Sequence, residues 1–155
     1  ASLYGTAARI GGIVAGHDQE TIDALTEYGN AYGMVFQIVD DILDVTATDE
    51  QLGKPAGHDM VEGVYTLPVI RTMGLGTPAA ADLTELLGNA LDADGQRAAI
   101  SIVRSNEGVA SAAATAQEYV DRATAACSGF ADTPATAALL AAPASLLENV
   151  SIPVT

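Results

Sequence analysis

The 155-residue sequence contains no tryptophan and only one cysteine. A lone Cys127 excludes an intrachain disulfide framework and any zinc site built on paired thiolates, so we expect a reducing, cytoplasmic location. The chain also lacks a run of about 18 apolar residues, the length needed to cross a bilayer. Residues 1–16 lack the charged leader and compact apolar core of a signal peptide. We therefore expect neither secretion by that route nor stable membrane insertion.

Cations are equally scarce, with six Lys and Arg against 20 Asp and Glu and a formal net charge of −14. Such a surface repels phosphate backbones and offers no basic stripe, which excludes nucleic acid as an expected partner. No GxxxxGK[ST] pattern is present to bind a nucleotide, and His17 and His58 are too far apart for a helical zinc pair. The acidity instead suits a protein that gathers divalent cations before it binds an anionic substrate.

Strand-forming residues are few, because aromatics make up 5% of the chain while alanine and leucine, which favour helix, are abundant. We expect an all-α fold, a helical bundle that forms a single domain over residues 1–155. The expected helices cover residues 2–15, 18–45, 78–91, 93–105, 108–130, 134–142 and 144–150, with a further restart at Leu67-Pro68. Residues 46–66 are expected to form a loop, and loops of this length in compact domains are usually functional or disordered.

The predicted helix over residues 18–45 begins with Asp18 as its N-cap and carries three aspartates near its other end. Asp40, Asp41 and Asp44 crowd one side within two turns, where like charges destabilise a helix. Carboxylates in this arrangement suit a hard cation such as Mg²⁺, which takes one or two of them and completes its shell with water and phosphate oxygens. The alternative is that the three side chains form an ordinary solvated helix face.

Two further segments follow the aspartates. The chain reads FQIVDDILDV from Phe36, LGKPAGHDMVEG from Leu52 and TLPVI from Thr66. At these spacings the three segments resemble the second aspartate-rich motif and following loop of trans-polyprenyl diphosphate synthases. The resemblance runs from about Ala1 to Pro153, and it implies the C-terminal part of the isoprenoid synthase fold.

This resemblance implies prenyl transfer: an allylic diphosphate ionises with magnesium on its leaving group, and isopentenyl diphosphate attacks the carbocation. Asp40 and Asp44 are then the first candidates for metal ligands. Asp41 is expected to ligate, to bind through water or to orient its neighbours. Asp59 either extends the acidic cluster or caps a turn.

Three residues are expected to bind the substrate. Gln37 would place its amide near the allylic diphosphate, the alternative being a plain surface amide. Phe36 would border the pocket and favour a cation through its ring, or else pack in the core. Lys54, the only lysine, would meet the diphosphate as a point charge.

The sequence also departs from this family. The half that carries the first aspartate-rich motif is absent, together with a Lys-Thr pair expected just before Ala1. Val64 stands where many members have lysine, which puts more weight on Lys54. We therefore interpret the chain as a C-terminal fragment of a prenyltransferase that is inactive alone and that forms a homodimer or associates through exposed helix faces. A noncatalytic, half-size partner of another synthase and a metal-free helical adaptor are the alternatives.

Overall fold

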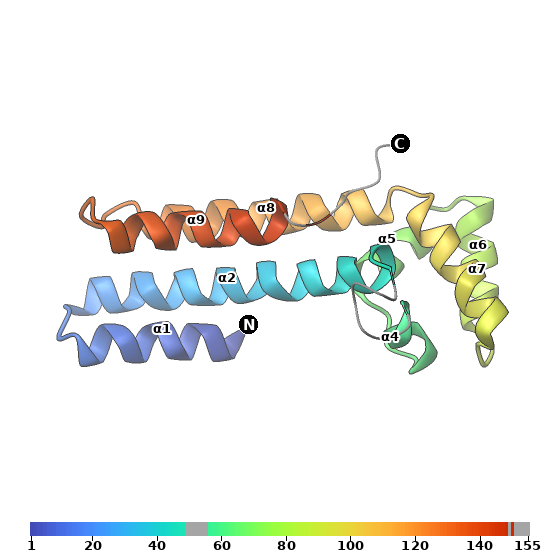
Figure 1. Ribbon diagram of the computed structural model, residues 1–155, viewed down its shortest axis with the longest axis horizontal. Helices are drawn as coiled ribbons and strands as arrows, with labels where there is room; N and C mark the ends of the chain where they lie inside the picture. Colours follow the sequence, from blue (N-terminus) through green and yellow to red (C-terminus); the bar gives the residue numbers. More distant parts are fainter. Residues whose placement is uncertain (49–55, 149, 151–155) are drawn as a thin grey trace. The chain divides into compact units, whose positions relative to one another are not determined.

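The computed structural model describes residues 1–48, 56–148 and 150, and these contain eight helices and no strand (Figure 1). The all-α prediction is confirmed. The helices are α1 (Ser2–Val14), α2 (Gln19–Thr46), α4 (His58–Val61), α5 (Leu67–Met73), α6 (Pro78–Leu87), α7 (Ala93–Arg104), α8 (Gly108–Ala126) and α9 (Pro134–Glu148). None of these described helices is long and apolar enough to cross a membrane.

The contacts of the chain divide it into two compact units. The first unit consists of residues 1–39 and 115–149, and the second of residues 40–114 and 150–155. Helix α2 therefore contributes its first 21 residues, Gln19–Val39, to one unit and its last turns to the other. That the whole chain folds as one domain stays a prediction.

In the first unit, α1 packs against α2 through a seam of glycines (Figure 1). A Cβ atom added to Gly5 would lie 2.1 Å from the side chain of Asn30, and one added to Gly29 would lie 2.6 Å from the carbonyl oxygen of Tyr4. Gly33 meets the backbone of Ala1 equally closely, at 2.6 Å. Glycine is therefore needed at Gly29 and Gly33, where a Cβ would meet the backbone of α1, whereas a Cβ at Gly5 would displace the Asn30 side chain.

Helices α2, α8 and α9 enclose the aromatic core of the first unit. Tyr28, Ala31, Ala123 and Cys127 are buried there, and Tyr32, Tyr119, Phe130 and Leu139 pack around them. Burial raises the pKa of the Cys127 thiol. A buried, protonated thiol fits a packing residue and not a nucleophile.

Helix α9 corrects the prediction of two short segments separated at Pro143. The structure has one continuous helix with Pro143 inside it, fully buried. Proline lacks the N–H that would donate to the carbonyl of Leu139, four residues earlier. The hydroxyl of Tyr28 on α2 donates to that carbonyl instead, at 2.9 Å. The prediction was wrong because a side chain distant in sequence replaces the missing donor.

The second unit packs around Val69, Leu83 and Val103, which are completely buried on α5, α6 and α7. Helix α8 begins against α5, where a Cβ on Gly108 would lie 2.0 Å from the hydroxyl of Thr72. In this unit, α4 is a helical turn inside the expected loop, and α6 ends at Leu87, before the predicted residue 91.

Candidate functional site

The aspartates lie on the last turns of α2, within the second unit. Asp40 is exposed, Asp41 is half-buried, and Asp44 is only 4% exposed. The three aspartates differ in burial because they lie at different angles around the helix. Ile42 and Val45 are fully buried, so the side of α2 that carries them, with Asp44 nearby, faces the core of the second unit. A wholly solvated face, the alternative reading of the motif, does not describe Asp44.

Asp41 contacts the first residue of helix α5. Its Oδ2 accepts a hydrogen bond from the backbone N–H of Leu67, 3.3 Å away, and Leu67 is the first residue of α5. The first N–H groups of a helix have no partner inside the helix, and a carboxylate stabilises that end. Asp41 thus stabilises the start of α5, and its expected role at a metal ion stays a prediction.

The main chain of Asp44 also makes a hydrogen bond outside its helix. Its carbonyl oxygen accepts a hydrogen bond from the N–H of Gly57, 2.7 Å away. Gly57 has a φ of 69°, and a Cβ at this position would lie 2.8 Å from Ile100 on α7. The glycine after Lys54-Pro55-Ala56 in the motif is therefore favoured by its left-handed backbone, and a Cβ there would also force the side chain of Ile100 to shift.

Two residues of α7 bind the same region and were not predicted from the sequence. Arg104 donates from Nε to the carbonyl oxygen of Val45 and from Nη2 to that of Ala47, at 2.5 and 2.9 Å. Gln96 donates to the carbonyl oxygen of Ala56 at 2.6 Å. No sequence signal marks them, because an arginine in the last turn of a helix and a glutamine in the first are common and carry no information on distant partners.

The expected substrate-binding residues are described in part. Phe36 and Gln37 lie on α2 in the first unit, and both are exposed. The Phe36 ring, 42% exposed, has its centroid 5.4 Å from that of Tyr4 on α1, so it packs on one side and is open on the other. Lys54 lies outside the described residues. Asp59 lies in the first turn of α4, and neighbouring His58 pairs with Glu62 at 3.2 Å.

The donor set fits a hard cation that shares its coordination with a ligand. Among the described residues, no group of three or more His, Cys, Asp or Glu side chains is placed to enclose a metal ion. Mg²⁺ does not require such a cage, because it commonly takes one or two carboxylates and keeps waters and phosphate oxygens in its shell. Asp40 at the surface and Asp44 one turn further along α2 are oxygen donors of the appropriate kind.

The sequence is similar to a known family and to several of its members. The sequence profile described as polyprenyl synthetase matches residues 1–103. The chain is 35% identical over 141 residues to the nonaprenyl diphosphate synthase of Mycobacterium tuberculosis, covering 90% of this chain and 42% of that protein. It is 36% identical over 123 residues to the heptaprenyl diphosphate synthase component 2 of Geobacillus stearothermophilus, covering 79% and 38%.

The fold agrees as well. A crystal structure of geranylgeranyl pyrophosphate synthase from Corynebacterium glutamicum, complexed with calcium and isoprenyl diphosphate, superposes with a TM-score of 0.89 at 32% identity, over 97% of this chain and 47% of that one. The chain thus spans less than half the length of these relatives. The profile match and these similarities show that the chain belongs to the polyprenyl synthetase family.

Proposed function

We propose that the end of α2 binds the magnesium complex of an allylic isoprenoid diphosphate. The whole protein would be a prenyltransferase that condenses this substrate with isopentenyl diphosphate. One observation carries the proposal: in a chain of this family, a buried aspartate, Asp44, stands one turn from an exposed one, Asp40. The relative from Corynebacterium glutamicum binds calcium and isoprenyl diphosphate, which supports the same ligand class here.

Each side chain has a distinct proposed role. When bound, Mg²⁺ would neutralise the charge that builds up on the departing diphosphate. Asp40, being exposed, is proposed as a direct ligand, and Asp44 as a ligand held by burial. Asp41 orients α5 through its bond to Leu67 and is proposed to reach the metal through water or its second oxygen.

The exposed side chains of Gln37 and Phe36 are proposed to contact the allylic substrate. Lys54 is proposed to bind the diphosphate. The residues described in this chain supply only part of such a site. We therefore propose that these 155 residues bind the ligand without catalysing transfer. Cytoplasmic location remains a prediction.

Thermal unfolding with inorganic diphosphate, with and without Mg²⁺, tests the binding site. Ligand at about 100 times its dissociation constant raises the unfolding free energy by about 2.7 kcal/mol. We expect a magnesium-dependent rise in Tm that Asp40→Asn abolishes; because Asp40 is exposed, this change should leave the unliganded protein folded.

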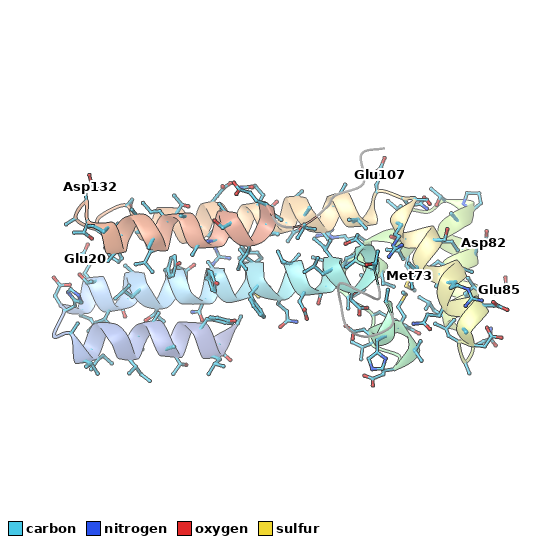
Figure 2. The ribbon with its side chains drawn as sticks, viewed as in Figure 1. Glu20, Met73, Asp82, Glu85, Glu107 and Asp132 are labelled. Atoms are coloured by element: carbon cyan, nitrogen blue, oxygen red, sulfur yellow. The ribbon has the colours of Figure 1, made fainter. Side chains whose placement is uncertain are left out.

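The matched control is Asp82→Asn with Glu85→Gln, which removes two exposed carboxylates from α6 (Figure 2). The control variant should keep nearly all of the magnesium-dependent shift. An equal loss in the control and in Asp40→Asn would mean that net charge alone attracts the cation, and no shift in the wild type would refute the site.

We also propose that α1 associates with a second copy of the chain. The face of α1 opposite the glycine seam carries Leu3, Ile10 and Val14, which are 78%, 54% and 82% exposed. They share one stripe because they are spaced by seven and four residues. The first acidic residue of the chain is Asp18. In a chain with a net charge of −14, this acid-free helix is where two copies can approach with little repulsion.

Sedimentation velocity tests the association. We expect a concentration-dependent dimer that Ile10→Asp dissociates, whereas Ile70→Asp, a similarly exposed isoleucine at 53% on α5, leaves it intact. A monomer at all concentrations would refute the homodimer. In that case a partner of the same family becomes the better occupant, and the relative named as a heptaprenyl synthase component favours the alternative of a noncatalytic partner subunit.

A further inference from the structure

We propose that Arg104 is a positioning residue for the aspartate-bearing end of α2. This inference rests on the proposed function, because it concerns the same carboxylates. Arg104 is half-buried at the end of α7, and its guanidinium donates hydrogen bonds to the carbonyl oxygens of Val45 and Ala47. Val45 follows Asp44 directly, so the guanidinium holds the main chain next to a proposed ligand.

The chemistry of a helix end explains why an arginine is suited to this place. The last four carbonyls of an α-helix have no partner within it, and they form the negative pole of the helix. The planar guanidinium presents several N–H groups in a fixed fork, so one side chain can bind two carbonyls at once. Here it binds one carbonyl in the last turn of α2, which ends at Thr46, and one just beyond that end.

A second set of contacts from α7 holds Ala56 and Gly57, which lie beside Asp44. Gln96, Ile100 and Arg104 follow each other at four-residue intervals and share one side of α7. Gln96 binds the carbonyl of Ala56, and Ile100 packs against Gly57, whose N–H binds the carbonyl of Asp44. One helix face thus fixes the chain on both sides of residues 49–55.

Arg104 differs from the other arginines whose contacts are described. Arg9, Arg97 and Arg122 each pair with a carboxylate, Asp23, Asp94 and Glu27 respectively. Those three pairs are largely exposed, where ion pairs contribute little. Arg97 lies two turns before Arg104 on the same helix and is therefore a matched control for the loss of one positive charge.

Positioning and simple electrostatics predict different results. If Arg104 mattered only through its charge, Arg104→Lys, which keeps that charge, would bind as the wild type does. If Arg104 holds α2 in place, the same change weakens binding, because ligand geometry is lost. Loss of a residue that orients a metal ligand typically lowers metal affinity about 10- to 100-fold.

Two measurements on the 155-residue chain test the proposal. The first is magnesium-dependent binding of inorganic diphosphate by calorimetry, at a temperature where every variant is folded. We expect about a tenfold loss in Arg104→Met and a clear loss in Arg104→Lys, whose single ammonium cannot reproduce the fork. Arg97→Met should bind as the wild type does. Wild-type or tighter binding by Arg104→Met, or full rescue by Arg104→Lys, would overturn the proposal.

The second measurement is amide hydrogen exchange without metal or diphosphate. The N–H of Ala47 binds the carbonyl of Leu43, and that of Gly57 binds the carbonyl of Asp44. We expect both amides to exchange at least tenfold faster in Arg104→Met and at the wild-type rate in Arg97→Met. Unchanged exchange in Arg104→Met would overturn the positioning role. Because this measurement needs no ligand, it separates a failure of the Arg104 proposal from a failure of the metal site itself.

Discussion

The hydrogen bond from Tyr28 to Leu139 yields a test of how α9 tolerates its internal proline. Tyr28 is 7% exposed on α2, and its hydroxyl donates to the carbonyl of Leu139, which Pro143 cannot serve. Replacing Tyr28 with phenylalanine keeps the ring and removes only the donor. The carbonyl of Leu139 then accepts a hydrogen bond neither from residue 143 nor from residue 28.

The expected cost follows from the loss of one bond and the exposure of its acceptor. A neutral hydrogen bond contributes about 0.5–1.5 kcal/mol, and leaving a buried polar group unsatisfied costs about 1–3 kcal/mol. This carbonyl is only partly buried, so we expect Tyr28→Phe to lower the unfolding free energy by about 1–2 kcal/mol. For a chain of this length, that loss lowers Tm by roughly 2–8 °C.

A double-mutant cycle identifies the cause. In Pro143→Ala, the new N–H of residue 143 can donate to Leu139 as in an ordinary helix, so the cost of Tyr28→Phe should fall by at least about 0.5 kcal/mol. Urea unfolding of the four proteins measures this difference, and the cavity left by the proline ring cancels between the arms. Tyr32→Phe is the control: its hydroxyl has no hydrogen-bond partner among the described residues, so this change should cost less than about 0.5 kcal/mol. An equal cost of Tyr28→Phe in both backgrounds would refute the reasoning.

Two further predictions concern the tyrosine proton and the glycine beside Asp44. Burial, followed by the charges of Cys127 and Tyr32, raises the pKa of Tyr28 from its usual value of 10.0 to about 12. Between pH 10 and 12 the unfolded chain therefore loses the Tyr28 proton while the folded chain keeps it. The excess unfolding free energy of the wild type over Tyr28→Phe should shrink as pH rises through this range. An excess that stays constant in urea titrations would contradict this prediction. Gly57→Ala should destabilise the protein by more than the roughly 1–2 kcal/mol that a left-handed backbone costs, because the side chain of Ile100 also obstructs the new Cβ. The control is Gly63→Ala, which has a φ of 77° and open space around it and should show the backbone cost alone. Equal costs of the two variants in thermal unfolding would argue against the close contact.

Most helices could be predicted because their signals are local. Asp18 accepts a hydrogen bond from the N–H of Thr21 at 2.8 Å, as expected of an N-cap, and the helix it begins runs to Thr46. Proline followed by a helix at Pro78, and a positive φ at Gly16 after α1, are equally local choices. The spacing of Asp40, Asp41 and Asp44 on one helix likewise follows from a helical period and needs no tertiary information.

The helix ends were predicted less well. Helix α8 ends at Ala126, before the predicted residue 130, where the N–H of Phe130 turns back to the carbonyl of Cys127. Alanine-rich sequence continues the helical pattern past this point, so the pattern alone could not place the turn.

The roles of individual side chains were decided by tertiary structure. The sequence by itself determined the helical class, the order of most helices, the glycine-rich segment after the aspartates and the family motif that joins them. It could not show that Pro143 lies inside a helix, that Asp41 binds the start of α5, or that Arg104 binds the end of α2, because each depends on a partner between 26 and 111 residues away. Local propensity reports which secondary structure a segment prefers by itself. A hydrogen bond between distant residues exists only once packing has brought its donor and acceptor together.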